Sequence, residues 1–346
     1  MQRIALVTDA WCPQINGVVT TLTHTVSELE RLGHEVLVIH PGQFRTAPLP
    51  SYPEIKCALL PGWRLRRQLD AFAPQAIHIA TEGPLGLAAR RYCRRHGLRF
   101  TTSLHTRFPE YVRLRLPFVP LAAGYAFLSW FHGGATRTLV SNPAMAEEMR
   151  ERGIANLALW SRGTDTETFR PDEPFPLEGE RPVFMYMGRV APEKNIEAFL
   201  KLDLPGTKYV IGDGPSLASL RRRYPAVRFT GYRTGRELAR HVAAADVFVF
   251  PSRTDTLGLV MLEAMACGVP VAAYPVLGPN SVVKNGETGC LHEDLRRAAL
   301  RALDLDRRRC REAACARSWR IVTREFVGQL VSAHAAALNT AGELRA

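Results

Sequence analysis

The chain has few lysines and no paired-cysteine motif, and the second absence narrows the classes of protein to which it can belong. Only five of its 45 basic residues are lysines, so arginine carries almost all of the positive charge. The seven cysteines include no C-x-x-C pair, which excludes a zinc framework, and their odd number indicates reduced thiols. We expect no signal peptide, because a strand is predicted from residue 3, and therefore a cytoplasmic protein. No low-complexity segment or short repeat is visible in the sequence.

The remaining composition is that of a globular protein with a basic surface. A length of 346 residues is sufficient for two domains, and 46% of the residues are hydrophobic. The net charge of +12 favours anionic partners such as phosphates, membranes or nucleic acid. Because the arginines are scattered over both halves and no recognition helix or RNA-binding motif occurs, we expect no nucleic-acid partner.

The first half alternates short apolar runs with amphipathic stretches, which predicts a parallel, doubly wound sheet. Predicted strands cover 3–8, 35–40, 76–80, 99–105, 138–141 and 157–161, and predicted helices cover 18–32, 85–96 and 143–152. A stretch rich in proline and acidic residues at 169–176 then interrupts the pattern and is typical of a linker.

The alternation restarts after this stretch, with predicted strands at 183–187, 209–211, 227–230, 246–250 and 269–274. We therefore predict an α/β protein with two doubly wound, Rossmann-like domains, 1–168 and 169–319, facing a central cleft. One long helical pattern covers 314–338, and we expect a C-terminal helix, about 320–346, to pack back on the first domain.

Two carboxylates, Asp255 and Glu263, bracket the most informative segment of the sequence. The first follows the strand at 246–250 and the second falls on the next helix, with a glycine-containing turn and a helix N-terminus between them. Free N–H groups at a helix N-terminus suit a phosphate. An acceptor-only side chain on each side suits hydroxyls at both ends of the ligand, so the arrangement is typical of a sugar-nucleotide site.

A second candidate loop, after the strand at 183–187, carries two cations that are five residues apart. Arg189 and Lys194 lie at the carboxyl end of the strand, where they can bind a diphosphate and stabilise its charge as it leaves. The alternative is a pair of solvated surface charges. A further loop, Gly212 to Gly214, either borders the nucleotide or is only a tight turn.

The first domain contributes two more candidates. Asn16 and Gly17 start a helix where backbone N–H groups can approach a phosphate or a sugar, or else form only a turn and cap. His105 follows a strand and either contacts substrate or is structural.

The stretch 107–131 combines arginines with aromatic residues in a run that is too short to span a bilayer. It is either a segment at a membrane interface or a buried helix, and basic clusters at 64–67 and 90–95 favour the membrane. The D-x-D pair at Asp304 and Asp306 lies at a helix end away from the candidate loops, so we expect no metal.

Together, the acidic pair with its seven-residue spacer, the loop Gly188-Arg189 to Lys194 and the loop Asn16-Gly17-Val18 resemble retaining glycosyltransferases of family 4, which have the GT-B fold. The resemblance spans nearly the whole chain, and it implies that domain 1–168 binds the acceptor and domain 169–319 the nucleotide sugar. Segments 8–19, 103–106 and 160–165 are similar to the lipid-directed branch. That branch includes GDP-mannose-dependent mannosyltransferases and sulfoquinovosyl- or glucosyl-diacylglycerol synthases that use UDP-sugars.

The resemblance implies a role for each matching residue. The implied donor-binding residues are Asn16, Gly17, Gly188, Arg189, Lys194, Asp255, Thr256, Leu257, Gly258, Leu259 and Glu263, of which Arg189 and Lys194 bind the diphosphate and Glu263 the ribose. Asp255 contacts the donor hexose, and His105 lies near the reacting carbon. The implied catalytic residues are thus His105, Arg189, Lys194 and Asp255. Many members have Glu at the position of Asp255, so the sequence leaves the donor sugar open.

The implied reaction is hexose transfer with retained configuration by front-side displacement, without cofactor or metal. The resemblance favours GDP-mannose as donor and a membrane lipid or glycolipid as acceptor, at an anionic membrane surface on the cytoplasmic side. The alternatives are a diacylglycerol glycosyltransferase that uses a UDP-sugar (glucose, glucuronate or sulfoquinovose) and a transferase to a soluble or polysaccharide acceptor. A sugar-nucleotide epimerase fits the acidic bracket less well.

Overall fold

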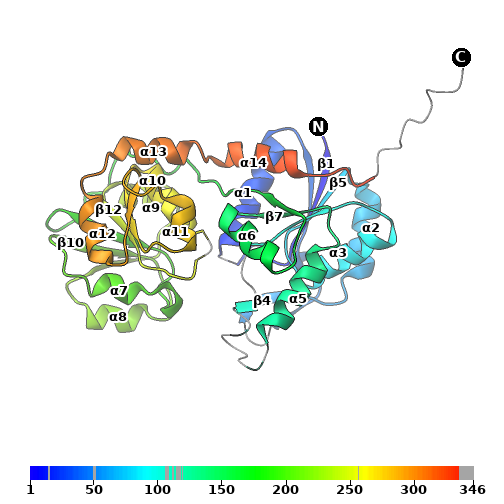
Figure 1. Ribbon diagram of the computed structural model, residues 1–346, viewed down its shortest axis with the longest axis horizontal. Helices are drawn as coiled ribbons and strands as arrows, with labels where there is room; N and C mark the ends of the chain where they lie inside the picture. Colours follow the sequence, from blue (N-terminus) through cyan, green and yellow to red (C-terminus); the bar gives the residue numbers. More distant parts are fainter. Residues whose placement is uncertain are drawn as a thin grey trace, which may run out of the picture. The chain divides into compact units, whose positions relative to one another are not determined.

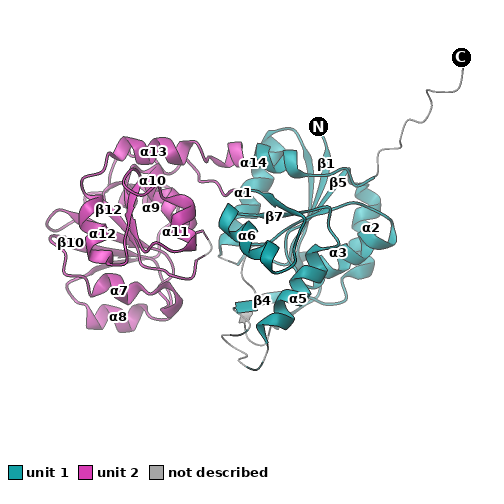
Figure 2. Ribbon diagram, in the orientation of Figure 1, with its two compact units in different colours: residues 1–160, 323–346 teal, residues 161–322 magenta. Residues whose placement is uncertain are grey.

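The computed structural model describes residues 1–14, 16–49, 52–105, 109–110, 113, 118, 120–255 and 257–334. The chain forms two compact units (Figure 2). The first contains residues 1–160 and 323–346, and the second contains 161–322. The second unit is therefore inserted into the chain of the first.

The first unit is built on a parallel six-stranded sheet in the order β2-β1-β5-β6-β7-β8. Its strands are β1 (Arg3–Val7), β2 (Glu35–Ile39), β5 (Ala76–Ile79), β6 (Thr101–Ser103), β7 (Arg137–Val140) and β8 (Leu157–Leu159). Strands β1, β5 and β7 of this sheet are labelled in Figure 1. β5 is buried at every position, as expected for a central strand covered on both faces. All six predicted strands of this half are confirmed, although β6 and β8 are shorter than predicted.

The helices of the first unit are α1 (Gly17–Arg31), α2 (Gly62–Phe72), α3 (Pro84–Arg95), α5 (Leu121–His132) and α6 (Pro143–Glu151). The three predicted helices correspond to α1, α3 and α6. Helix α2 and the antiparallel hairpin β3 (Thr46–Leu49) and β4 (Tyr52–Ala58) are additions to the predicted elements. Within the described part of the chain, no helix has both the length and the apolar character needed to cross a bilayer.

The second unit repeats the architecture with a parallel sheet in the order β11-β10-β9-β12-β13-β14. Its strands are β9 (Val183–Met187), β10 (Thr207–Ile211), β11 (Arg228–Gly231), β12 (Val247–Phe250), β13 (Val271–Ala273) and β14 (Gly289–Leu291). Its helices are α7 (Ile196–Leu200), α8 (Leu217–Arg223), α9 (Gly235–Ala243), α10 (Leu259–Ala266), α11 (Leu277–Val282), α12 (Leu295–Ala302) and α13 (Arg307–Cys315). The five predicted strands of this half are confirmed, and β14 is an addition.

The second unit begins at Ser161, before the proline-rich stretch that we expected to separate the domains. Thr164 forms a parallel bridge with Ser318, and its N–H donates to the Arg317 carbonyl at 3.0 Å. The Arg311 guanidinium donates to the carbonyls of Thr166 and Phe169 at 2.9 and 2.6 Å. These contacts attach residues 164–169 to the second unit.

The prediction of one continuous helix over 314–338 is wrong. α13 ends at Cys315, and a separate helix, α14, covers Trp319–Gln329. Between the two helices, the backbone of Arg317 and Trp319 is hydrogen-bonded to the backbone of Thr164. In the first unit, Phe326 of α14 packs on Trp160 with 4.6 Å between ring centroids. Ala333 then donates to the Gln75 carbonyl at 2.7 Å and accepts from the Arg99 N–H at 2.8 Å. The predicted continuation from 335 to 346 lies outside the described residues.

Each sheet has one point at which the chain changes direction across the strand order. In the first unit this point lies between β1 and β5, and in the second unit it lies between β9 and β12. Ligands of open parallel sheets bind beyond the carboxyl ends of the strands at such a switch point. The loops that follow these four strands are therefore where each unit should bind a ligand.

Candidate active site

The loop after β9 carries the predicted cations and rests on the loop after β10. The two loops approach so closely that a Cβ atom added to Gly212 would lie 1.9 Å from the Gly188 carbonyl oxygen. A Cβ atom at Gly214 would lie 2.4 Å from the Val190 oxygen. The glycines at 212 and 214 are thus explained by close backbone packing, a reason that differs from both interpretations of that loop.

Lys194 and Asp255, which are far apart in the sequence, meet beside the switch point of the second unit. Lys194 Nζ lies 2.5 Å from Asp255 Oδ1, and both side chains are largely buried. The Asn195 amide donates to the Pro251 carbonyl at 3.0 Å and so ties the two loops together. The other oxygen, Asp255 Oδ2, is buried without a hydrogen-bond partner. Arg189 is exposed, with its guanidinium 4.0 Å from Glu193.

Helix α10 begins shortly after Asp255, and its N-cap residue, Gly258, has no side chain to cap the N-terminus, nor does the structure show a cap from another described residue. Gly258 adopts a left-handed conformation (φ 86°) before the first helical residue, Leu259, while Leu257 is buried. Gly278 lies against the same loop, because a Cβ atom added there would be 2.5 Å from the Asp255 carbonyl oxygen. The uncapped amides and the positive end of the helix dipole favour an anion at this place. The predicted contact residue Thr256 lies outside the described residues.

Glu263 lies one turn into α10 and is half-buried. Burial, and to a smaller extent the negative charge of Asp165, raises the pKa of its carboxyl group to about 7. Asp165 itself accepts the N–H groups of Glu167 and Thr168 at 3.1 and 3.0 Å. The proximity of Asp165 to Glu263 could not be predicted, since the two are almost a hundred residues apart in the chain.

In the first unit, Asn16 is a helix cap, as in the simpler interpretation of its loop. Its Oδ1 atom accepts the N–H groups of Val18 and Val19, both at 3.0 Å, at the start of α1. Gly17 is the first residue of that helix. Asn16 thus ends the loop after β1 and Gly17 begins α1, beside the switch point.

Asp9 is a functional candidate that the sequence reasoning missed. Its carboxylate accepts the Thr81 hydroxyl at 2.9 Å and the N–H groups of Leu85 and Gly86 at 2.9 and 3.3 Å. Burial raises the pKa of Asp9 to about 6, although these hydrogen bonds oppose the rise. The carboxylate therefore occupies the N-terminus of α3.

His105 lies two residues beyond β6, and its ring is hydrogen-bonded to a side chain of that strand. Its Nε2 atom lies 2.8 Å from Ser103 Oγ, which lies 3.1 Å from Nε2 of the wholly buried His78. His78 Nδ1 in turn lies 2.9 Å from Thr101 Oγ1. The His105 ring is thereby oriented at the carboxyl edge of the sheet.

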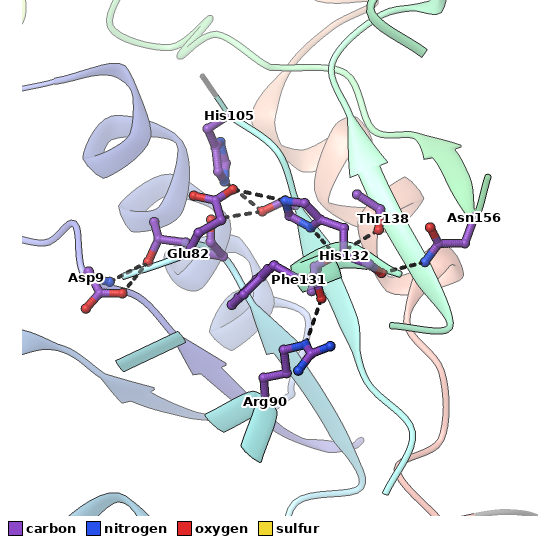
Figure 3. Close-up of polar contacts among 12 residues, drawn as sticks. Asp9, Glu82, Arg90, His105, Phe131, His132, Thr138 and Asn156 are labelled. Carbon is purple, nitrogen blue, oxygen red and sulfur yellow. Dashed lines mark hydrogen bonds and ion pairs between the residues drawn. The ribbon is translucent and has the colours of Figure 1, made fainter. Parts of the chain in front are cut away.

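A second buried histidine lies on the other side of β6 (Figure 3). His132 Nδ1 lies 2.9 Å from Thr102 Oγ1, and His132 Nε2 lies 3.1 Å from Glu82 Oε1. The Asn156 amide donates to the His132 carbonyl at 3.0 Å, and Arg90 donates to the Phe131 carbonyl at 3.0 Å. Sequence reasoning missed this network, because its members come from five separate segments.

Helix α5 supports the buried interpretation of the aromatic stretch for one of its faces. Tyr125, Leu128 and Phe131 are buried, whereas Trp130 is 52% exposed and lies under the Arg90 guanidinium at 3.9 Å. Asp306 caps α13 by accepting the Arg308 N–H at 2.9 Å, so this member of the D-x-D pair has a structural role. The described residues contain no group of three or more His, Cys, Asp or Glu side chains that could hold a metal ion.

Comparison with known proteins identifies the chain. Residues 15–168 match the family described as Glycosyltransferase Family 4, and residues 181–305 match Glycosyl transferases group 1. A GDP-mannose-dependent alpha-mannosyltransferase of Mycobacterium tuberculosis is 31% identical over 94% of this chain and 95% of its own length. The chain belongs to glycosyltransferase family 4. This family-4 glycosyltransferase is accordingly an enzyme of the hexosyltransferase type.

Two further comparisons concern the branch of the family and the fold. An alpha-monoglucosyldiacylglycerol synthase of Streptococcus pneumoniae is 27% identical over 87% of this chain and 78% of its own length. Sucrose-phosphate synthase of Thermosynechococcus elongatus superposes with a TM-score of 0.74 at 20% identity, covering 95% of this chain and 98% of that one. The predicted GT-B fold and the similarity to the lipid-directed branch are confirmed.

Proposed function

We propose that this glycosyltransferase transfers a hexose with retained configuration from a nucleotide-diphosphate sugar, GDP-mannose in the first place, to a membrane lipid or glycolipid. The main support is the Lys194–Asp255 pair beside the uncapped N-terminus of α10, at the switch point of the second unit. The names of the mannosyltransferase and diacylglycerol-synthase relatives support the donor and the acceptor.

A donor diphosphate would exchange partners with this pair. The negative charge of the diphosphate attracts Lys194 and Arg189. Its oxygens accept hydrogen bonds from the first N–H groups of α10, so that no metal is needed to neutralise the charge. As Lys194 turns to the phosphate, Asp255 becomes free to accept hydroxyls of the hexose, with Oδ2 already unpaired. Glu263, one turn further, accepts the ribose hydroxyls.

The bond between the anomeric carbon and the phosphate oxygen breaks while the acceptor oxygen approaches from the same face of the sugar. The acceptor proton passes to the leaving phosphate oxygen. Lys194, Arg189 and the α10 amides stabilise the charge that develops on that phosphate, which is the main catalytic contribution available here. His105 contacts the hexose near the reacting carbon.

A lipid acceptor is supported by an exposed apolar and basic surface on the first unit. Leu60 is 98% exposed and Trp63 is 69% exposed at the start of α2, followed by Arg64, Arg66 and Arg67. Helix α3, bonded to α2 through Tyr92 and Asp70 at 2.7 Å, adds further arginines. Apolar side chains beside arginines suit the headgroup region of an anionic membrane, on its cytoplasmic side.

A panel of GDP- and UDP-sugars tests the donor. We expect slow hydrolysis of one donor by the purified protein, and its transfer to dioctanoylglycerol or octyl α-mannoside with a retained anomeric configuration by NMR. Absence of hydrolysis and of transfer with every donor would refute the proposed function. Trapping of a covalent glycosyl-enzyme would refute the front-side route.

Liposome sedimentation tests the membrane. We expect the protein to pellet with phosphatidylglycerol vesicles and not with phosphatidylcholine vesicles, and Leu60→Ser with Trp63→Ser to abolish pelleting. Tyr232→Ser, at an exposed position of the second unit, is the matched control. A protein that remains in the supernatant at physiological salt would favour a soluble or polysaccharide acceptor.

A donor with another hexose, such as a UDP-sugar, is the second candidate, and the observation that bears on the hexose is Asp255 itself. Its side chain is shorter than the Glu of many relatives, so it reaches a different hydroxyl of the hexose. Preference for UDP-glucose, UDP-glucuronate or UDP-sulfoquinovose in the panel would select this alternative.

A further inference from the structure

The two switch points differ in the charge that they present to a ligand. The second unit presents Lys194, Arg189 and the uncapped α10 N-terminus, which attract phosphate. The first unit has a helix N-terminus at the same position, that of α3, but Asp9 already occupies it through Leu85 and Gly86. A phosphate there would meet a carboxylate instead of free amides.

The loop after β5 adds a second carboxylate, that of Glu82. It is close enough to Asp9 that its charge, after burial, contributes to raising the Asp9 pKa. Two carboxylates at one place repel phosphate by the same Coulombic argument that makes the other switch point attract it. An uncharged ligand with hydroxyl groups suits this edge of the first unit.

Glu82 differs from its neighbours because only one of its two carboxylate oxygens has a hydrogen-bond partner among the described residues. Asp9 and Thr81 are bonded to each other and to α3. Glu82 Oε1 meets His132 Nε2 at 3.1 Å, while its side chain remains 17% exposed. Oε2 has no hydrogen bond and is not among the buried atoms that lack one, so it faces solvent.

The orientation of Glu82 is set from the protein interior. His132 is wholly buried, and its other ring nitrogen meets Thr102, which meets Thr138 at 2.9 Å. Figure 3 shows the Glu82 carboxylate directed at a ring nitrogen of His132. His105, from the loop after β6, is drawn above Glu82 in the same view. A carboxylate fixed through one oxygen and open at the other is a preorganised hydroxyl acceptor.

We propose that Glu82 binds a hydroxyl group of the acceptor substrate, a sugar or glycerol polyol, at the switch point of the first unit, and that His132 is its positioning residue. This rests on the proposed transferase function and adds to it the residue that recognises the acceptor. The interaction is made with the acceptor alone, so it leaves the nucleotide unaffected.

The test compares transfer with hydrolysis of the same donor, in which water replaces the acceptor. For Glu82→Gln we expect the KM for octyl α-mannoside, which has hydroxyls besides the reacting one, to rise about ten- to a hundredfold, the usual effect of losing a hydrogen bond to a charged group. Donor hydrolysis and nucleotide affinity should stay within about twofold of wild type. His132→Gln should raise the acceptor KM in the same direction with hydrolysis unchanged.

Asp70→Asn is the matched control, because Asp70 is an exposed carboxylate of the same unit, bonded to Tyr92 and Arg66. An unchanged acceptor KM in Glu82→Gln, or an equal loss of transfer and hydrolysis, would overturn the proposal. If the wild type neither transfers nor hydrolyses any donor, the proposed function fails. Saturation-transfer NMR with octyl α-mannoside then still decides the role of Glu82, since binding to wild type that Glu82→Gln lacks supports it and equal or absent binding overturns it.

Discussion

The pKa of Glu263 leads to a prediction that separates stability from function. Burial and the nearby Asp165 raise this pKa from 4.5 to about 7. The folded protein thus binds the proton more tightly than the unfolded chain does. The free energy of unfolding therefore falls as pH rises from about 4.5 to about 7, and the full loss is present above 7.

The magnitude follows from the two pKa values. At about 1.4 kcal/mol per pKa unit, the difference between 4.5 and about 7 corresponds to roughly 3 kcal/mol. Glu263→Gln keeps the shape of the side chain and has no proton to lose. We expect the variant to match wild type near pH 4 and to be more stable by up to about 3 kcal/mol at pH 8, a rise in Tm of about 6–12 °C.

Thermal unfolding from pH 4 to 8.5 measures this difference, and the carboxyl ¹³C resonance of Glu263 reports its titration directly. Glu312→Gln, at an exposed position of α13, is the control and should show no pH-dependent difference. Nucleotide affinity should respond in the opposite sense, because only an ionised Glu263 accepts two ribose hydroxyls well. A stability difference that is the same at pH 4 and pH 8, or a variant less stable at pH 8, would refute the reasoning.

Three further substitutions test other parts of the structure. Lys194→Ala should lower turnover about 10²- to 10³-fold with a smaller effect on nucleotide affinity, and an unchanged rate constant would contradict its role beside the leaving phosphate. Gly278→Ala places a Cβ atom 2.5 Å from the Asp255 carbonyl oxygen and should weaken nucleotide binding in calorimetry about tenfold, whereas Gly328→Ala, with open space around it, should not. Asp9→Ala leaves the first amides of α3 unpaired and should lower the free energy of unfolding by about 1–2 kcal/mol in urea titrations, with nucleotide affinity as the unaffected control.

The strands and the candidate loops could be predicted because the signal for each lies within a few consecutive residues. Runs such as 183–187 and 247–250 are apolar throughout, which is typical of strands buried on both faces, and glycines mark the turns that follow. Lys194 and Asp255 were placed on loops of the same kind, and the fold brings them to 2.5 Å. Their pairing also requires that β9 and β12 are neighbours in the sheet, and the sequence does not predict that strand order.

What could not be predicted depends on partners far away in the chain. Asp9 caps α3 from more than seventy residues upstream, and His132 meets Glu82 from fifty residues downstream. The break between α13 and α14 has the same origin, because Thr164 bonds to the backbone of Arg317 and Trp319 and so stops a pattern that is locally helical. Local propensity is a weak guide wherever a tertiary contact competes with it.

The insertion of the second unit into the chain of the first has a consequence for synthesis. Residues 161–322 are contiguous and are joined near their two ends by the Thr164–Ser318 bridge, so this unit is complete as soon as its last residue has left the ribosome. The first unit, although translated earlier, still lacks Phe326 against Trp160 and Ala333 between Gln75 and Arg99. Because domains fold as units during synthesis, we expect the half of the enzyme that is made first to reach its native state last, with its edge open until then to chaperones.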